Sequence, residues 1–227
     1  MGCVIIYMHI HDVEFNVLTR FGQDGVLSFI FNILHAVERR KFTYLNIVNF
    51  RANQTCNPLV SMVNQTNFHK GCFMSCLAPA SVLSLKTDIK ANIVVALQTV
   101  TSDIDLLHIN HGYNDFWYLK FVLDSNIKPK VICIPYNRNI PFTKSLTVPF
   151  TPNPRHNNNY RSCSLKALCS ILPNYFIFGC SYSKIVYFVR ADIKGYLPDI
   201  QSTYDFNTRT WKLIKDKFWV CVKPKPI

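Results

Sequence analysis

The stretch that decides the fold is IDLLHINHGYNDFW, residues 104–117. Its first half is apolar apart from Asp105 and His108, which is typical of a strand buried in a parallel sheet. Its second half, from Asn110 to Asp115, is a polar turn that leads into a helix. In an open α/β sheet, ligands bind beyond the carboxyl ends of the strands. We therefore expect this turn to lie at a ligand-binding edge, with Asp115 as its only acid.

Strand-like and helix-like segments alternate along most of the chain, as expected for strands that are joined by helical crossovers. Asp24 is the expected N-cap of the first helix, and Ser162 or Ser164 that of the last. The expected helices are 22–40, 57–66, 115–125 and 162–172, and the expected strands are 42–48, 71–77, 104–109, 129–137, 175–181 and 184–190.

The last two expected strands are separated only by a short polar turn, which predicts a hairpin. We therefore expect an α/β domain with a mostly parallel sheet, helices on both faces and a C-terminal antiparallel hairpin. We place this domain at residues 21–193. An N-terminal extension (1–20) precedes it, and a C-terminal extension (194–227) packs on it.

The chain of 227 residues carries a formal net charge of +12 and has a pI of about 9.3. This balance is compatible with a basic surface that has no particular ligand and with an acidic partner such as nucleic acid or an anionic membrane face. Basic residues are dense only in VERRKF (37–42) and VKPKPI (222–227), so nucleic-acid binding is not the favoured prediction. No apolar run reaches the ~18 residues that span a bilayer, so no transmembrane segment is expected. The first residues lack the basic region of a signal peptide, and a cytoplasmic location is expected.

Other chemistries have weaker support in the sequence. His69, Cys72 and Cys76 share one short stretch, but their spacing is not that of a zinc finger or ribbon, so we expect no metal site. Nine cysteines and seven histidines allow a Cys/His nucleophile pair, yet nothing marks one cysteine as activated. The aromatic run Phe116–Tyr118 is expected to be core rather than a stacking surface.

Six stretches, in order along the chain, carry a resemblance to one family. They are FGQDGVLSFIF, DLLHINHGYNDFW, VICIPYN, TKSLTVPFTPNP, CSLKAL and FGCSYSKIVYFVRADI. Together they resemble the FkbM-type S-adenosylmethionine-dependent methyltransferases over roughly residues 20 to 193. The resemblance implies a Rossmann-like methyltransferase fold, with S-adenosylmethionine as the cofactor if one is bound.

The chain departs from this family at positions that would hold the cofactor. Asn46 stands where the family's first strand ends in an acid, and Val48 stands where it has a glycine. Ser75 and Cys76 end the second strand, where the family has an acid for the ribose hydroxyls. Further family acids are replaced by Asn110, Gly112, Pro135, Lys144 and Thr151. The negative charge that would bind the methionine ammonium and the ribose is therefore largely missing.

The resemblance also implies which residues make up the site. The candidate catalytic residues are Asn114 and Asp115. The candidate cofactor-binding residues are Gln23, Asp24, Asn46, Ser75 and Asn110.

The loss of acids favours a catalytically degenerate, methyltransferase-like protein that acts as a binding or regulatory protein, through an unknown protein partner or an acidic ligand. One alternative is an active O-methyltransferase with a remodelled cofactor site that uses Asp24, Asn114 and Asp115. Another is a basic protein that binds nucleic acid through its positive surface.

Overall fold

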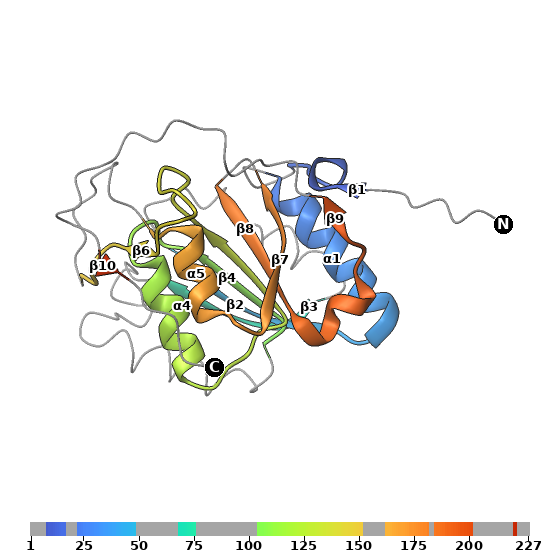
Figure 1. The fold of residues 1–227 in the computed structure, drawn as a ribbon. Helices are drawn as coiled ribbons and strands as arrows, with labels where there is room; N and C mark the ends of the chain where they lie inside the picture. Colours follow the sequence, from blue (N-terminus) through green and yellow to red (C-terminus); the bar gives the residue numbers. More distant parts are fainter. Residues whose placement is uncertain are drawn as a thin grey trace.

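The computed structural model describes most of an α/β domain (Figure 1). The residues it describes are 8–16, 22–48, 68–75, 104–151, 162–181, 184–201 and 220–221. Their elements are β1 (Met8–His9), η1 (Ile10–Asp12), α1 (Gln23–Glu38), β2 (Phe42–Val48), β3 (Phe68–Ser75), β4 (Leu106–Asn110), α4 (Asp115–Asp124), β5 (Val131–Pro135), β6 (Leu146–Thr147), α5 (Leu165–Ile171), β7 (Tyr175–Ser181), β8 (Ile185–Arg190), η3 (Ala191–Tyr196), β9 (Ile200–Gln201) and β10 (Val220–Cys221).

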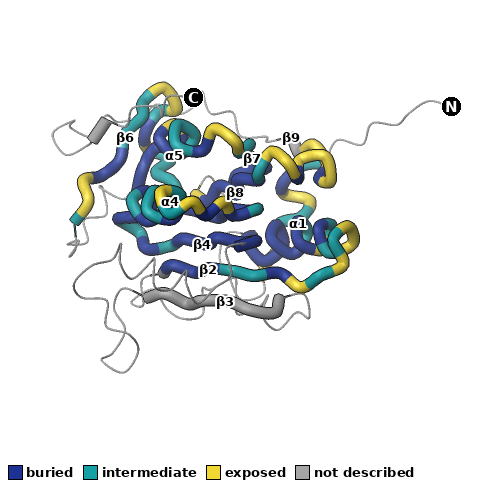
Figure 2. Tube along the Cα trace, turned by 90° about the horizontal axis from the view of Figure 1, so that it is seen from below, coloured by how far each residue is buried: buried dark blue, intermediate teal, exposed yellow. Residues whose placement is uncertain are grey.

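The main sheet has six strands in the order β3-β2-β4-β5-β8-β7. The strands β3, β2, β4 and β5 are parallel, whereas β8 is antiparallel to both β5 and β7. The expected mixed α/β sheet with a C-terminal antiparallel hairpin is therefore confirmed. Strands β4 and β8 are buried along nearly their whole length (Figure 2). This burial explains why the strand sequences are almost continuously apolar.

Helices cover both faces of this sheet. Figure 1 shows α4 and α5 on one side and α1 on the other. Alternate residues of each strand enter different cores, as the twofold repeat of a strand requires. Leu107 and Ile109 of β4 pack with α4 and α5, whereas Leu106 packs with Leu27 and Ile30 of α1.

The element boundaries mostly agree with the sequence pattern, and β2 spans the expected residues. The expected strand 71–77 is β3, which begins at Phe68 and ends at Ser75. The expected helix 57–66 and the last two residues of the expected strand 71–77 lie outside the described residues.

The prediction that Asp24 caps α1 is wrong. Helix α1 begins at Gln23, and its N-cap is Gly22, whose φ of 68° is a left-handed conformation that favours glycine. Of the two candidate caps of α5, Ser164 is the N-cap, and its Oγ accepts a hydrogen bond from the backbone N of Ala167 (3.1 Å).

Short strands tie both ends of the described chain to the body of the molecule. Strand β1 pairs with β9 in parallel, and β10 pairs with β6 in antiparallel. Ile10, which follows β1, is fully buried in the core that α1 forms with the sheet. These contacts join residues before 20 and after 194 to the domain.

Candidate functional site at the carboxyl edge of the sheet

The order of the strands creates a switch point between β2 and β4. The chain passes from β2 to β3 on one side, and β4 then lies on the other side of β2. Val48 at the end of β2 pairs with Ser75 of β3 and with Asn110 of β4, so three carboxyl ends lie in one row. Open α/β sheets bind ligands beyond the strand ends at such a point. Two candidate cofactor-binding residues, Ser75 and Asn110, therefore lie on either side of Val48 at the end of β2.

The turn after β4 is held in shape by Asp115. Its Oδ1 accepts hydrogen bonds from the backbone N of His111 (2.7 Å) and of Gly112 (3.0 Å). Gly112 has a φ of 91°, a conformation that side chains rarely adopt, so glycine is needed there. The carboxylate also lies in the first turn of α4, where the helix dipole favours a negative charge. Asp115 thus shapes its own turn.

Asp115 is fully buried, and its environment changes its acidity. Burial raises the pKa of Asp115 to about 6, and the hydrogen bonds from Gly112 and His111 limit the rise. Its Oδ2 is buried and receives no hydrogen bond from the described residues. The nearby Ser162 hydroxyl donates instead to the carbonyl of Pro135 (3.0 Å). A carboxyl group with this pKa changes its charge within the mildly acidic range.

Asn114, the other candidate catalytic residue, binds a distant segment of backbone. Its Nδ2 donates to the carbonyl of Thr151 (2.7 Å), and its Oδ1 accepts from the N of Thr151 (3.3 Å). One turn further, the Nε1 of Trp117 donates to the carbonyl of Val148 (2.8 Å). Both polar ends of the Asn114 amide are thus used to fasten the 148–151 segment onto α4.

The centre of the switch point holds a buried neutral pair. Asn46 and His108 are register partners on β2 and β4, both are fully buried, and His108 Nδ1 lies 2.7 Å from Asn46 Oδ1. Burial lowers the pKa of His108 to about 3, so the ring is neutral near pH 7. Since an amide oxygen only accepts, the proton lies on Nδ1. Among the described residues, nothing bonds to Asn46 Nδ2 or His108 Nε2.

Gln23 and Asp24, two further candidate cofactor-binding residues, are the first two residues of α1. Both are buried, and Gln23 Oε1 accepts a weak hydrogen bond from the thiol of Cys133 (3.9 Å), the register partner of His108. Helix α1 packs on the face of the sheet opposite to α4. The structure therefore brings Gln23 close to the Asn46–His108 row, whereas Asp24 and Asp115 begin helices that pack on opposite faces of the sheet.

Cys133, Cys163 and Cys180 do not have the environment of an activated nucleophile. Burial raises the pKa of the thiols of Cys133 and Cys163, and it raises that of Cys180 to about 12. A thiol in this state is protonated at neutral pH, and the thiolate is the reactive form. Phe116 and Tyr118 are core residues, as expected.

No group of three or more His, Cys, Asp or Glu side chains within the described ranges is arranged to hold a metal ion. Within the same ranges, no helix has the length and apolar character needed to cross a membrane. Comparison of the chain with protein-family models, curated proteins and solved structures found no match.

Sequence reasoning missed two features of the site. It named Asn46 as a candidate cofactor-binding residue in place of an acid and gave His108 no partner, yet the two form one hydrogen-bonded pair. It also named Thr151 only as a residue that replaces an acid of the family, whereas the backbone of Thr151 is what Asn114 binds. The Asn46–His108 pair had a signal in the sequence, because each of the two residues lies two positions before the end of its strand.

Proposed function

We propose that this chain is a methyltransferase-like domain of FkbM type that no longer binds S-adenosylmethionine and acts as a binding or regulatory protein. The parallel strands with a C-terminal antiparallel hairpin are what the resemblance leads us to expect of a Rossmann-like methyltransferase fold. That agreement supports the fold part of the proposal. The functional part depends on the chemistry at the switch point.

The observation that carries the proposal is the Asn46–His108 pair. In the family, the position of Asn46 is an acid whose charge attracts the ammonium of the cofactor. Here the side chain is a neutral amide, fully buried, and its oxygen already binds a neutral histidine at 2.7 Å. A cationic group brought to this position meets a neutral amide and a neutral ring in place of a carboxylate, which compensates less of the cost of desolvating the charge.

The remaining polar groups of the site are also engaged within the protein. Asp115 Oδ1 accepts two backbone N–H bonds, and the Asn114 amide binds the backbone of Thr151 at both ends. Each charge-assisted hydrogen bond that the cofactor loses weakens binding by about 1.5–3 kcal/mol. Several such losses move a micromolar dissociation constant to millimolar or weaker, at about 1.4 kcal/mol per tenfold.

The test is thermal unfolding of the purified chain with and without millimolar S-adenosylmethionine or S-adenosylhomocysteine. A ligand present at 100 times its dissociation constant stabilises a protein by roughly 2.7 kcal/mol, so binding is easily detected. We expect no shift in Tm for the wild type. Cooperative unfolding in the same scans shows that the protein is folded.

The matched variant is Asn46→Asp, which restores the family's acid with almost no change in volume. If only charge is missing, this variant gains a cofactor-dependent shift that the wild type lacks. A clear shift of the wild type, or methyl transfer from S-adenosylmethionine to any hydroxyl compound, contradicts the proposal and favours the alternative of a remodelled active site.

That alternative, an active O-methyltransferase, has one observation in its favour. The pKa of Asp115, about 6, is suited to a general base near neutral pH. In an active enzyme, Asp115→Asn would abolish turnover without unfolding the protein, because the amide oxygen still accepts bonds from the turn. Turnover that survives this change eliminates Asp115 as a base.

A further inference from the structure

The basic stretch VERRKF lies at the opposite end of the sheet from the switch point. It forms the last turn of α1 and the start of β2, at the edge where the parallel strands begin. Lys130 precedes β5, and Arg190 ends the antiparallel β8 with its backbone N bonded to the carbonyl of Lys130. Basic residues that are far apart in the sequence are therefore gathered along this amino edge.

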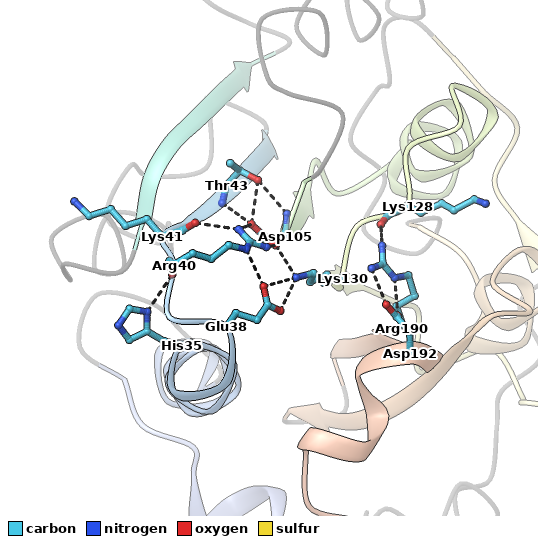
Figure 3. Close-up of polar contacts among 10 residues, drawn as sticks. All are labelled: His35, Glu38, Arg40, Lys41, Thr43, Asp105, Lys128, Lys130, Arg190 and Asp192. Atoms are coloured by element: carbon cyan, nitrogen blue, oxygen red, sulfur yellow. Dashed lines mark hydrogen bonds and ion pairs between the residues drawn. The ribbon is translucent and has the colours of Figure 1, made fainter.

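Among the residues that the structure describes, the carboxylates at this edge are paired with basic residues. Asp105 is fully buried, and it accepts from Arg40 Nη1 (2.8 Å) and from the backbone N of Thr43 (2.8 Å). Glu38 binds Arg40 Nε (2.8 Å) and the ammonium of Lys130. Figure 3 shows Arg40 and Lys130 converging on these two acids. This cluster holds α1 to the sheet.

The Arg190–Asp192 pair lies beside this cluster. Arg190 Nε binds Asp192 Oδ1 (2.7 Å), and the guanidinium also donates to the carbonyl of Lys128. Asp192 is therefore neutralised by its own basic partner and does not offset other cations of the edge.

A surplus of positive charge remains after these pairings. The surface formed by the residues that carry this surplus is named the basic edge; they are Arg39, Lys41, Lys128 and Lys194. All four are exposed, and none forms an ion pair with a carboxylate among the residues that the structure describes. In Figure 3, the side chains of Lys41 and Lys128 point away from the cluster on opposite sides.

The spacing of these cations suits an extended polyanion. Lys41 and Lys128 lead into β2 and β5, which are separated by β4, so the two strand starts are about 10 Å apart at about 4.8 Å per strand. Arg39 and Lys194 extend the row over α1 and η3. A single small anion would contact only one of these positions, whereas a phosphate backbone carries a charge every few ångströms.

We propose that the basic edge binds the phosphate backbone of a nucleic acid. An anionic membrane is the less suitable partner, because surface binding to lipid also needs apolar side chains that insert. Of the described large apolar residues that are exposed, only Val37 and Tyr196 belong to the elements of this edge. A tyrosine is also able to stack on an exposed base. This surface lies away from the switch point and does not depend on the cofactor site.

The test measures binding of a short, mixed-sequence, single-stranded oligonucleotide to the full chain by fluorescence anisotropy at increasing salt concentration. The variant carries Arg39→Glu, Lys41→Glu and Lys128→Glu, which leaves the ion-pair cluster of Arg40, Lys130, Glu38 and Asp105 intact. The matched control carries Lys120→Glu, Lys166→Glu and Lys184→Glu, which changes the net charge equally on α4, α5 and the hairpin turn.

The wild type and the control are expected to bind with a steep dependence on salt. Each phosphate contact contributes about 0.7 to the slope of log Kd against log salt on a single strand, so the loss of three contacts makes the slope of the basic-edge variant shallower by about 2. At about 0.1 M salt this corresponds to roughly a hundredfold weaker binding. Equal losses in both variants overturn the proposal, as does the absence of binding by the wild type at low salt. Binding to phosphatidylserine vesicles without binding to the oligonucleotide overturns it in favour of a membrane.

Discussion

At the scale of single residues, the Asn46–His108 pair brings one favourable hydrogen bond and two buried polar groups without a partner. The hydrogen bond of 2.7 Å stabilises the pair, while Asn46 Nδ2 and His108 Nε2 are buried without a partner in the described structure. A hydrogen bond contributes about 1 kcal/mol net, whereas a buried unsatisfied group costs about 1–3 kcal/mol. By these values the two unsatisfied groups cost more than the hydrogen bond contributes, so the pair lowers the stability of the fold.

We predict strong coupling in a double-mutant cycle on this pair. Asn46→Leu or His108→Leu alone leaves the other polar side chain buried without its partner, and each should lower the free energy of unfolding by about 1–3 kcal/mol. The double variant removes both polar groups and should be less destabilised than the sum of the single variants. Denaturant unfolding measures the three differences, and additive values would mean that the two side chains do not act as a pair.

The second residue-scale prediction concerns the pH dependence of stability at Asp115. Its pKa is raised by burial from 3.8 to about 6, so the folded protein binds the proton more tightly than the unfolded chain does. The contribution of this group to stability is full below about pH 4 and is lost as the pH rises through about 6, by about 3 kcal/mol at about 1.4 kcal/mol per pKa unit.

Asp115→Asn provides the comparison, because the amide cannot ionise. The unfolding free energy of the wild type minus that of the variant should fall as the pH rises from about 4 to about 6, and it should be level above that range. His108 acts in the opposite direction, since its lowered pKa destabilises the folded protein as the pH falls, but it is present in both proteins. Parallel stability curves would contradict the raised pKa of Asp115.

At the scale of elements, the start of α1 is covered by residues 13–16. The backbone N of Gly22 donates to Asn16 Oδ1 (2.6 Å), and the backbone N of Gly25 donates to the carbonyl of Phe15 (3.2 Å). Two of the amide groups that a helix leaves unpaired at its N-terminus are thus satisfied by the preceding chain. The approach is very close, because a Cβ added at Gly25 would lie 2.0 Å from the carbonyl oxygen of Val13.

We predict that Gly25→Ala destabilises the protein, although alanine is the better helix former. The new methyl group collides with the backbone of residues 13–15, which must move away from α1. Gly195→Ala is the matched control, because a Cβ there meets no atom within 4 Å. The Tm of the Gly25 variant should fall by several degrees while the control stays near the wild type; equal values would show that the N-terminal segment does not pack on α1.

At the scale of the whole molecule, residues far apart in sequence complete one core. Ile10 is fully buried and belongs to the cluster formed by α1 and the sheet. A Cβ added at Gly179 would lie 2.1 Å from Ile10 Cδ1, so the absence of a side chain on β7 makes room for Ile10. The pairing of β1 with β9 brings residues 200–201 to the same place.

We predict that Ile10→Ala lowers the stability of the entire domain, in a single cooperative transition. Truncation of a buried isoleucine costs about 2–5 kcal/mol, whereas Val37→Ala at an exposed position should change stability by about 0.5 kcal/mol or less. Denaturant unfolding followed by circular dichroism and by tryptophan fluorescence measures both. A local loss of signal with an unchanged main transition would show that the N-terminal segment is separate from the core.

The elements could be predicted from local sequence because their signals are local. Each of these signals depends on residues that are close together in the sequence. They are the mostly apolar runs of β4 and β5, the helical spacing of α1 and the polar turn between β7 and β8. The start of α1 was the exception. Asp24 has the chemistry of a cap, but the left-handed conformation of Gly22 and the contacts of residues 15–16 place the helix start one residue after Gly22.

By itself, the sequence determined the mixed α/β class, the C-terminal hairpin and the uncharged residues at the ends of the first strands. Only the tertiary structure decided that Asn46 and His108 form a pair, that Asp105 binds Arg40 and that Ile10 enters the core, across separations such as 62 and 65 residues. The reason is physical: periodicity and turn chemistry depend on neighbours along the chain, whereas these contacts depend on strand order, register and the face that each strand presents.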